Sequence, residues 1–532
     1  MSLKPIGIVG EYSTPTEVDI KSNYPVSSGT YVYMRFKAKD QVRDAEEERE
    51  VIGIVGSTVY RSVIPIIVSP GLGPFESYMS DLKRESYMKV LLIADITKGR
   101  PEFPTYPPPP ETPVYLARLE HLRMIYSCEP TRGIRVGSLV GFESLEIRAR
   151  VNSLAKHLLI AGTTGSGKSN LVAILADRIA QIGGSVVIFD VHGEYGGLVS
   201  ESKDVVVSVH EALINLLKVP IGLLVNFIIP EPAATKQRRI LRNALRKLNA
   251  DIFEQSRSKV IPPVEVVRRL YVSRVGLEHG EMPNKLPDPL MLYRELLKEH
   301  VEGESKEDRT VSYINDKIDD FFEWHRVSLE SPNVSELVSY GKIVVVDVSA
   351  LVDSEKDYML KVIAENILWS LKEGIIPPTL LVVEEAHLFL GREASTWSKE
   401  ALQRFIREGR KFGGMLAIVS QRPRALDTGV VSQVQNYAFL RLVQKADRSV
   451  LMELTDILSE EYTDILPSLP PGHGVLLGEW TDWYPAYVKL DLHRGKRAGA
   501  TPNIVDKWRC GADAARVKRE DFKSLASEWE GD

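Results

Sequence analysis

From about residue 155 onward, the chain alternates short continuous apolar runs with segments whose apolar residues recur at helical spacing. Continuous apolar runs are typical of strands buried on both faces, and helical segments between them favour a parallel sheet. We therefore predict an α/β fold, a parallel sheet with helices on both faces. The apolar runs are HLLIAG (157–162), SVVIFD (185–190), DVVVSV (204–209), KIVVVDVS (342–349), TLLVVEE (379–385), MLAIVSQ (415–421) and YAFLRL (437–442).

Two other parts of the chain have different patterns. Residues 1–150 hold short β-branched and aromatic runs separated by Gly, Pro and charged turns, which predicts a small N-terminal β-barrel. Residues 230–335 have helical periodicity throughout, which predicts an insertion of about four helices. This insertion divides the α/β core into a first part at 151–229 and a second part at 336–491, and a charged tail with one predicted helix follows at 492–532.

Composition limits the classes of protein that fit. The chain has 532 residues, of which 44% are hydrophobic and 26% charged, as in ordinary globular proteins. Its net charge of -5 gives no basic footprint over the whole molecule, so any nucleic-acid contact has to be local. Two cysteines do not make a disulfide framework, and neither a signal peptide nor a membrane-spanning run is evident. We expect a cytoplasmic protein with no membrane attachment.

A phosphate-binding loop is the clearest chemical signal. GTTGSGKS (162–169) fits the pattern G-x-x-x-x-G-K-[ST] between a predicted strand and a predicted helix. Glycines let backbone N–H groups turn toward phosphate oxygens, and the following helix N-terminus favours negative charge. We expect Lys168 to reach the β- and γ-phosphates of ATP and Ser169 to ligate Mg²⁺. The residues expected to bind nucleotide are Gly162, Thr163, Thr164, Gly165, Ser166, Gly167, Lys168, Ser169 and Asn170.

Polar residues at the ends of three later strands complete the predicted site. The run LLVVEEAH ends in Glu384, expected to hold Mg²⁺ through water, and Glu385, expected to activate the attacking water. Most phosphate-loop ATPases have Asp at the first position, so the division of work between the two acids stays open. Gln421 is expected to sense the γ-phosphate. Asp190 and Glu194, in DVHGEY, are further candidates for contact with nucleotide or DNA-facing loops.

Three cations lie close together in REGRKFG (407–413), just before a predicted strand. They form either a solvated helix end or a trans-acting arginine that reaches the ATP site of a neighbouring subunit, which requires a ring. Arg410 is the first candidate and Arg407 the second, because spacing alone does not separate them. A basic stretch, Lys236 to Lys247, is a candidate DNA surface or simply the solvated side of an amphipathic helix.

Taken in order, GTTGSGKSN, DVHGEY, LLVVEEAH, EGRKFG and SQRP resemble the HerA branch of the HerA/FtsK DNA-translocating ATPases over about residues 140–490. The resemblance implies a RecA-like core in a homo-hexameric ring that threads double-stranded DNA. It also implies work with the nuclease NurA in end resection, beside Mre11–Rad50. By position it carries over Lys168, Ser169, Glu384, Glu385, Gln421 and Arg410 as the site.

Two other functions fit parts of the pattern. A type IV secretion-like ATPase shares the core but moves DNA or protein through a membrane complex. A nucleotide-binding scaffold would switch without turnover, which the acidic pair and Gln421 argue against.

Overall fold

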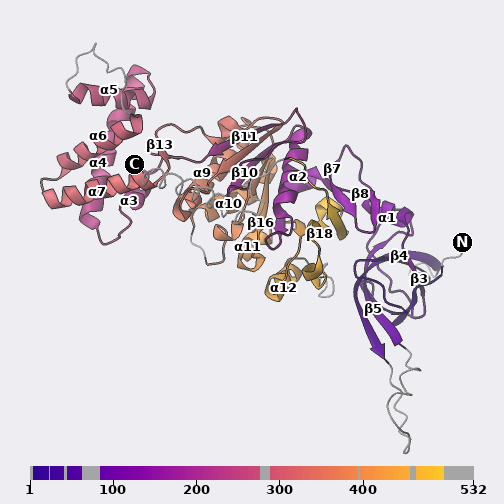
Figure 1. The fold of residues 1–532 in the computed structure, drawn as a ribbon. Coiled ribbons are helices and arrows are strands. Elements are labelled where there is room, and N and C mark those ends of the chain that lie inside the picture. The colour runs from indigo at the N-terminus through magenta and orange to yellow at the C-terminus, as the bar shows by residue number, and fades with distance from the viewer. Residues whose placement is uncertain are drawn as a thin grey trace, which may run out of the picture.

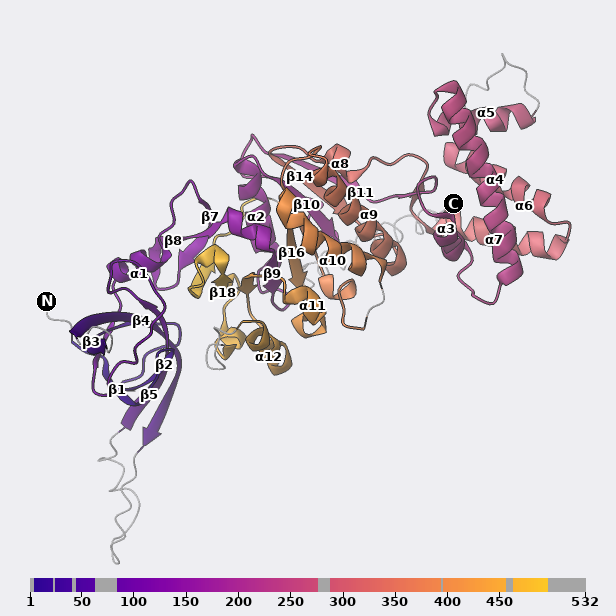
Figure 2. The ribbon, with the colours of Figure 1, turned by 180° about the vertical axis from the view of Figure 1, so that it is seen from behind.

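The computed structural model describes residues 4–22, 24–40, 45–62, 84–275, 288–393, 396–455 and 463–495. Three parts follow one another in space: a barrel, a large sheet flanked by helices, and a group of helices (Figure 1). The reverse view in Figure 2 agrees that the barrel and the separate helices lie at opposite ends of the molecule, with the sheet between them.

The N-terminal barrel closes because its sixth strand pairs with both the first and the third. Its interior is filled by residues such as Ile20, Val32, Met34 and Met88, which alternate with outward-facing residues along the strands. In spatial order the strands are β1 (Gly7–Ser13), β2 (Glu17–Ser22), β5 (Arg84–Asp95), β4 (Ala45–Ser62), β3 (Tyr31–Asp40) and β6 (Pro113–Leu116).

The barrel strands end at Leu116, which differs from the expected barrel of residues 1–150. After helix α1 (Leu119–Tyr126), strands β7 (Gly133–Leu139) and β8 (Phe142–Arg150) join the large sheet, where β7 pairs with β19 (Ala486–Leu490). Nearly every residue of β7 is buried, as expected for a strand between two others.

The central sheet has eleven strands in the order β11-β14-β10-β15-β16-β9-β17-β18-β19-β7-β8. Its strands from β11 to β17 are parallel, which confirms the predicted α/β core, and the remaining four add antiparallel. The remaining bounds are β9 (Leu158–Ala161), β10 (Ser185–Asp190), β11 (Val206–Glu211), β14 (Lys342–Asp347), β15 (Thr379–Val383), β16 (Gly414–Ser420), β17 (Asn436–Phe439) and β18 (His473–Gly478).

Every residue of the central strands is buried, because helices cover both faces of this sheet. These strands are β9, β10, β15, β16 and β17. Helix α2 packs against β7, β10 and β14, while α9 and α10 pack against β16 and each other. The helices of the core are α2 (Lys168–Gln181), α8 (Val334–Leu337), α9 (Asp353–Lys372), α10 (Trp397–Gly409), α11 (Thr428–Val431) and α12 (Lys445–Leu454).

The helical insertion has a hydrophobic core of its own. The chain enters and leaves it through two short paired strands, β12 (Ile214–Asn215) and β13 (Val327–Ser328). Between them lie α3 (Ile221–Ile228), α4 (Thr235–Lys259), α5 (Pro263–Val275), α6 (Pro289–Glu304) and α7 (Asp308–Trp324). Within the described ranges, no helix combines the length and the apolar character needed to cross a membrane.

Candidate nucleotide-binding site

Sheet order brings the predicted site together. β16 lies between β9, which leads into the phosphate loop, and β15, which leads into the acidic pair, and β10 lies beside β15. All four strands are parallel, so the residues that follow them meet at one edge of the sheet.

The phosphate loop connects β9 directly to α2. Gly165 and Gly167 have positive φ angles of 74° and 112°, a backbone conformation that favours glycine. A Cβ at Gly162 would come within 2.6 Å of the Ser166 hydroxyl oxygen. These glycines therefore allow a turn that other residues would strain.

Lys168 lies at the centre of the site. Its ammonium donates to the Thr163 carbonyl oxygen at 3.1 Å, across the loop it belongs to. Burial lowers the pKa of Lys168, while the nearby carboxylates of Glu385, Glu384 and Glu194 act in the opposite direction. One cation thus faces three acids, and a phosphate chain in the loop would share that cation.

The two acids after β15 lie in different surroundings. Glu384 is buried and accepts a hydrogen bond of 2.6 Å from the Tyr195 phenol, and burial raises its pKa to about 8. Glu385 has a φ of +45°, in the left-handed region that non-glycine residues rarely occupy. From this backbone position, the Glu385 carboxylate accepts a hydrogen bond from the Gln421 amide nitrogen.

Gln421, at the end of β16, joins the phosphate loop to the acidic pair. Its amide oxygen accepts a hydrogen bond of 2.7 Å from the Thr164 hydroxyl, and its amide nitrogen donates to Glu385. His387 Nδ1 lies 3.3 Å from the other oxygen of Glu385, which is buried and has no hydrogen-bond partner among the described residues. A buried carboxylate oxygen left without a donor suits a base that awaits a water molecule.

Asp190 and Glu194 have separate tasks in the turn after β10. The buried Asp190 carboxylate accepts the backbone N–H groups of Tyr195 at 2.8 Å, Glu194 at 3.1 Å and His192 at 3.3 Å, so it shapes the turn. Burial raises the pKa of Asp190. Glu194 instead reaches the phosphate loop, where it accepts a hydrogen bond of 2.5 Å from the Ser169 hydroxyl.

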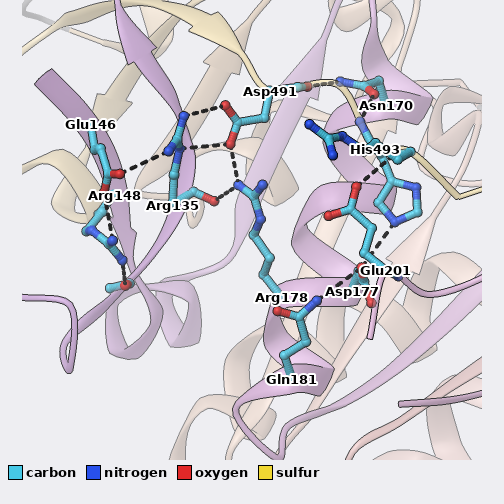
Figure 3. Close-up of polar contacts among 12 residues, drawn as sticks. Arg135, Glu146, Arg148, Asn170, Asp177, Arg178, Gln181, Glu201, Asp491 and His493 are labelled. Carbon is cyan, nitrogen blue, oxygen red and sulfur yellow. Dashed lines mark hydrogen bonds and ion pairs between the residues drawn. The ribbon is translucent and has the colours of Figure 1, made fainter. Parts of the chain in front are cut away.

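Asn170 points away from the loop, to the segment that follows β19. Its side-chain N–H donates to the Asp491 carbonyl oxygen at 2.7 Å, and its oxygen accepts the His493 backbone N–H at 3.0 Å. Figure 3 shows this clamp beside the buried contact of His493 with Asp177 and the contacts of the Asp491 carboxylate with Arg135 and Arg178. The helix after the phosphate loop therefore holds the segment that follows β19.

Arg407 and Arg410 lie far from this site in their own chain. Both are exposed, and neither has an ion-pair partner among the described residues. The two arginines precede β16, whereas Gln421 follows it. The seven-residue strand therefore separates the arginines from Gln421 by about 20 Å along the sheet. The arginines and the phosphate loop occupy opposite edges of one sheet.

Oxygen donors suited to Mg²⁺ surround Ser169. Its hydroxyl, at the start of α2, donates to Glu194, which follows β10, while Glu384, which follows β15, accepts a hydrogen bond from Tyr195. All three supply the hard oxygen ligands that Mg²⁺ prefers. Among the described residues, no group of three or more acidic, His or Cys side chains could hold a metal by itself. That composition fits Mg²⁺, which keeps several waters and is usually held together with nucleotide phosphates.

Sequence reasoning missed Tyr195 and His387. Tyr195 directly follows Glu194 and His387 lies two residues after Glu385, so adjacency to predicted site residues was the available signal. Of the predicted residues, the structure brings Thr164, Ser169, Glu384, Glu385 and Gln421 together with Lys168 and Glu194.

Known proteins similar to this chain were found by sequence and by structure. A family described as "Helicase HerA, central domain" matches residues 134–367. The DNA double-strand break repair helicase HerA of Sulfurisphaera tokodaii is 31% identical over 95% of this chain and 96% of its own length. The protein of the same name from Saccharolobus solfataricus is 31% identical over 97% of each chain. The structure of VirB4 from Thermoanaerobacter pseudethanolicus is 18% identical with a TM-score of 0.42, and the match covers 69% of this chain and 99% of that one.

Proposed function

The chain belongs to the HerA helicase family, and from this membership and its nucleotide site we propose that it is an ATP-driven motor that moves along double-stranded DNA. The bridge that Gln421 makes between Thr164 and Glu385 carries the proposal. Through it, a change at the phosphates can reach the acid that would activate water. The relatives are named as DNA double-strand break repair helicases, and we assign this chain the same class of substrate.

We assign the site residues as follows. Lys168 and the phosphate loop bind ATP, and Ser169 and Glu384 hold Mg²⁺, which supplies charge neutralisation at the phosphates when it is bound. Glu385 accepts a proton from the attacking water, because one of its oxygens is buried without a hydrogen-bond partner among the described residues while Gln421 holds the other. Gln421 orients Glu385 and releases or renews its contact with Thr164 as the γ-phosphate leaves.

The active motor is a homo-hexameric ring in this proposal. Arg410, and Arg407 as the alternative, lie at the sheet edge opposite their own phosphate loop, so they serve a site only across a subunit boundary. Their exposure without an ion-pair partner in the described part of the chain agrees with a contact that forms on assembly.

Contact with DNA has to come from local basic surfaces. In the stretch Lys236 to Lys247, the lysines at its two ends pair with acids of the same insertion, Glu307 and Glu304. Arg239 and Arg246 remain exposed on α4. Because the lysines are paired, we favour a mainly solvated side of the helix over a continuous DNA-binding face. The two exposed arginines are then available to DNA phosphates in this stretch.

Proposed partners follow from the family. We propose that the barrel, which lies at one end of the molecule (Figure 1), docks the nuclease NurA. DNA leaving the ring would then enter the nuclease for end resection in the cytoplasm, beside Mre11–Rad50. Removing the barrel should abolish capture of purified NurA. The deletion should end at Leu116, because β7 and β8 belong to the central sheet.

The motor proposal is tested by ATP turnover measured with and without duplex DNA, together with particle symmetry in electron micrographs. We expect DNA-stimulated turnover without sequence preference, DNA affinity that falls steeply with salt, and six-fold rings. Turnover that ignores DNA, or affinity that ignores ionic strength, would overturn it.

A further inference from the structure

The turn after β10 is built to present two adjacent side chains to the nucleotide site. Asp190 accepts three backbone N–H groups of the turn, and Gly193 has a φ of +71°. The backbone of Glu194 and Tyr195 is thereby fixed. From it, Glu194 reaches Ser169 on α2, and Tyr195 reaches Glu384 after β15.

The hydrogen bond from Ser169 to Glu194 decides how the serine oxygen can be used. A hydroxyl has one hydrogen to donate and two lone pairs, and an ionised carboxylate only accepts. With the hydrogen directed to Glu194 at 2.5 Å, a lone pair of Ser169 Oγ can face another partner, although the Tyr195 phenol also contacts this hydroxyl. A serine hydroxyl that pointed its hydrogen at a cation could not ligate it.

Glu384 does not perform this task in the structure. One of its oxygens, Oε1, accepts a hydrogen bond from the Tyr195 phenol at 2.6 Å, and among the described residues Ser169 does not hydrogen-bond to it. The site therefore uses two acids from two strands: one held by a phenol, and one that holds the serine.

We propose that Glu194 is a positioning residue for Mg²⁺ binding, which orients the Ser169 hydroxyl so that its oxygen faces the metal ion of bound nucleotide. The inference rests on the proposed use of Mg²⁺ with ATP. It adds Glu194 to Glu384 and Glu385, the two acids that the sequence predicts for the site. Glu194 acts through Ser169, and its carboxylate also lies near enough to Lys168 to raise the pKa of that ammonium.

The test compares equilibrium binding of a fluorescent, slowly hydrolysed ATP analogue in Mg²⁺ and in EDTA, using the full chain. In the parent protein Mg²⁺ should strengthen binding. Glu194→Ala should reduce that Mg²⁺-dependent gain by about 10-fold or more, the usual range for a hydrogen bond to a charged group. Affinity in EDTA should not fall, because the lost carboxylate near Lys168 would repel a metal-free triphosphate. A merely structural role would weaken binding in both conditions.

Two further variants sharpen the result. Glu201→Ala truncates an acid that accepts the Arg494 backbone N–H at 2.7 Å, away from Ser169, and should leave the Mg²⁺ gain intact. In a double-mutant cycle, adding Glu194→Ala to Ser169→Ala should cause little additional loss, because the acid acts through the serine.

The possible failures are distinguishable. If Mg²⁺ does not strengthen binding in the parent protein, the proposed metal use is wrong and this inference falls with it. If the parent responds to Mg²⁺ and Glu194→Ala responds equally, only the role of Glu194 is overturned. Losses that simply add in the double variant would likewise exclude action through Ser169.

Discussion

Replacing Glu384 by glutamine should make the nucleotide-free protein locally more stable, increasingly so as the pH rises. Burial raises the pKa of Glu384 to about 8 from its ordinary 4.5. Between pH 4.5 and pH 8, Glu384 keeps its proton in the folded chain but has released it in the unfolded chain. The free energy of unfolding therefore falls as the pH increases. The difference of about 3.5 in pKa corresponds to about 5 kcal/mol above pH 8, and to about 3 kcal/mol at pH 7. Glutamine has the same shape and no proton to lose.

Hydrogen exchange followed by mass spectrometry measures the change in local stability, at peptides that cover β15 (Thr379–Val383). Parent and variant are compared at the same pH, so the intrinsic exchange chemistry cancels. We expect the variant's protection to exceed the parent's by a few-fold near pH 5 and by more than about 100-fold at pH 7.

Glu365→Gln removes an exposed acid from α9 and provides the matched control. The ratio of variant to parent protection at β15 should stay near one at every pH. A constant offset for Glu384→Gln would reflect the new amide's hydrogen bonding. A ratio that does not grow with pH would refute the raised pKa and the argument built on it.

Three other changes have defined outcomes. Glu385→Gln should retain ATP binding but lower phosphate release by about 100-fold or more, since an amide cannot take the proton of water; near-normal release would move the base elsewhere. Arg410→Ala should lower turnover by up to about 1000-fold, and mixing it into parent subunits should inhibit more than in proportion, whereas a linear loss would indicate action in cis. Asp357→Ala should destabilise α10 by about 1–2 kcal/mol, seen as faster exchange at Trp397 and Ser398, whose backbone N–H groups Asp357 accepts; unchanged exchange there would mean that another group caps the helix.

Local patterns predicted the parts of the site that are continuous in sequence. The phosphate loop, the acids after β15 and Gln421 after β16 each follow an apolar strand, and parallel pairing necessarily brings strand ends to one edge. The periodicity also predicted a helical insertion at 230–335, where α4 to α7 lie, whereas in the structure the insertion begins earlier, with α3 after β12.

Pairings between distant segments were not visible in the sequence. Tyr195 and Glu384 are separated by 189 positions, and nothing near either residue specifies the other. The contacts of Asn170 could not be predicted for the same reason, because its partners follow β19 in the sequence. The predicted barrel of 1–150 includes β7, because nothing in GIRVGSL (133–139) specifies which sheet the segment joins, and only its pairing with β19 does so.

That pairing has a consequence for biosynthesis. The β7–β8 hairpin emerges from the ribosome before the phosphate loop, yet its neighbour β19 is translated about 350 residues later, as the contact between Arg135 and Asp491 illustrates. The barrel closes with strands that are all made before residue 117, so it can fold while translation continues. One edge of β7 must then wait, unpaired and apolar, until nearly the whole chain has been made. A ribosome that stalls within the insertion would leave that edge exposed, and nascent chains halted there should be the ones most prone to aggregate or recruit chaperones.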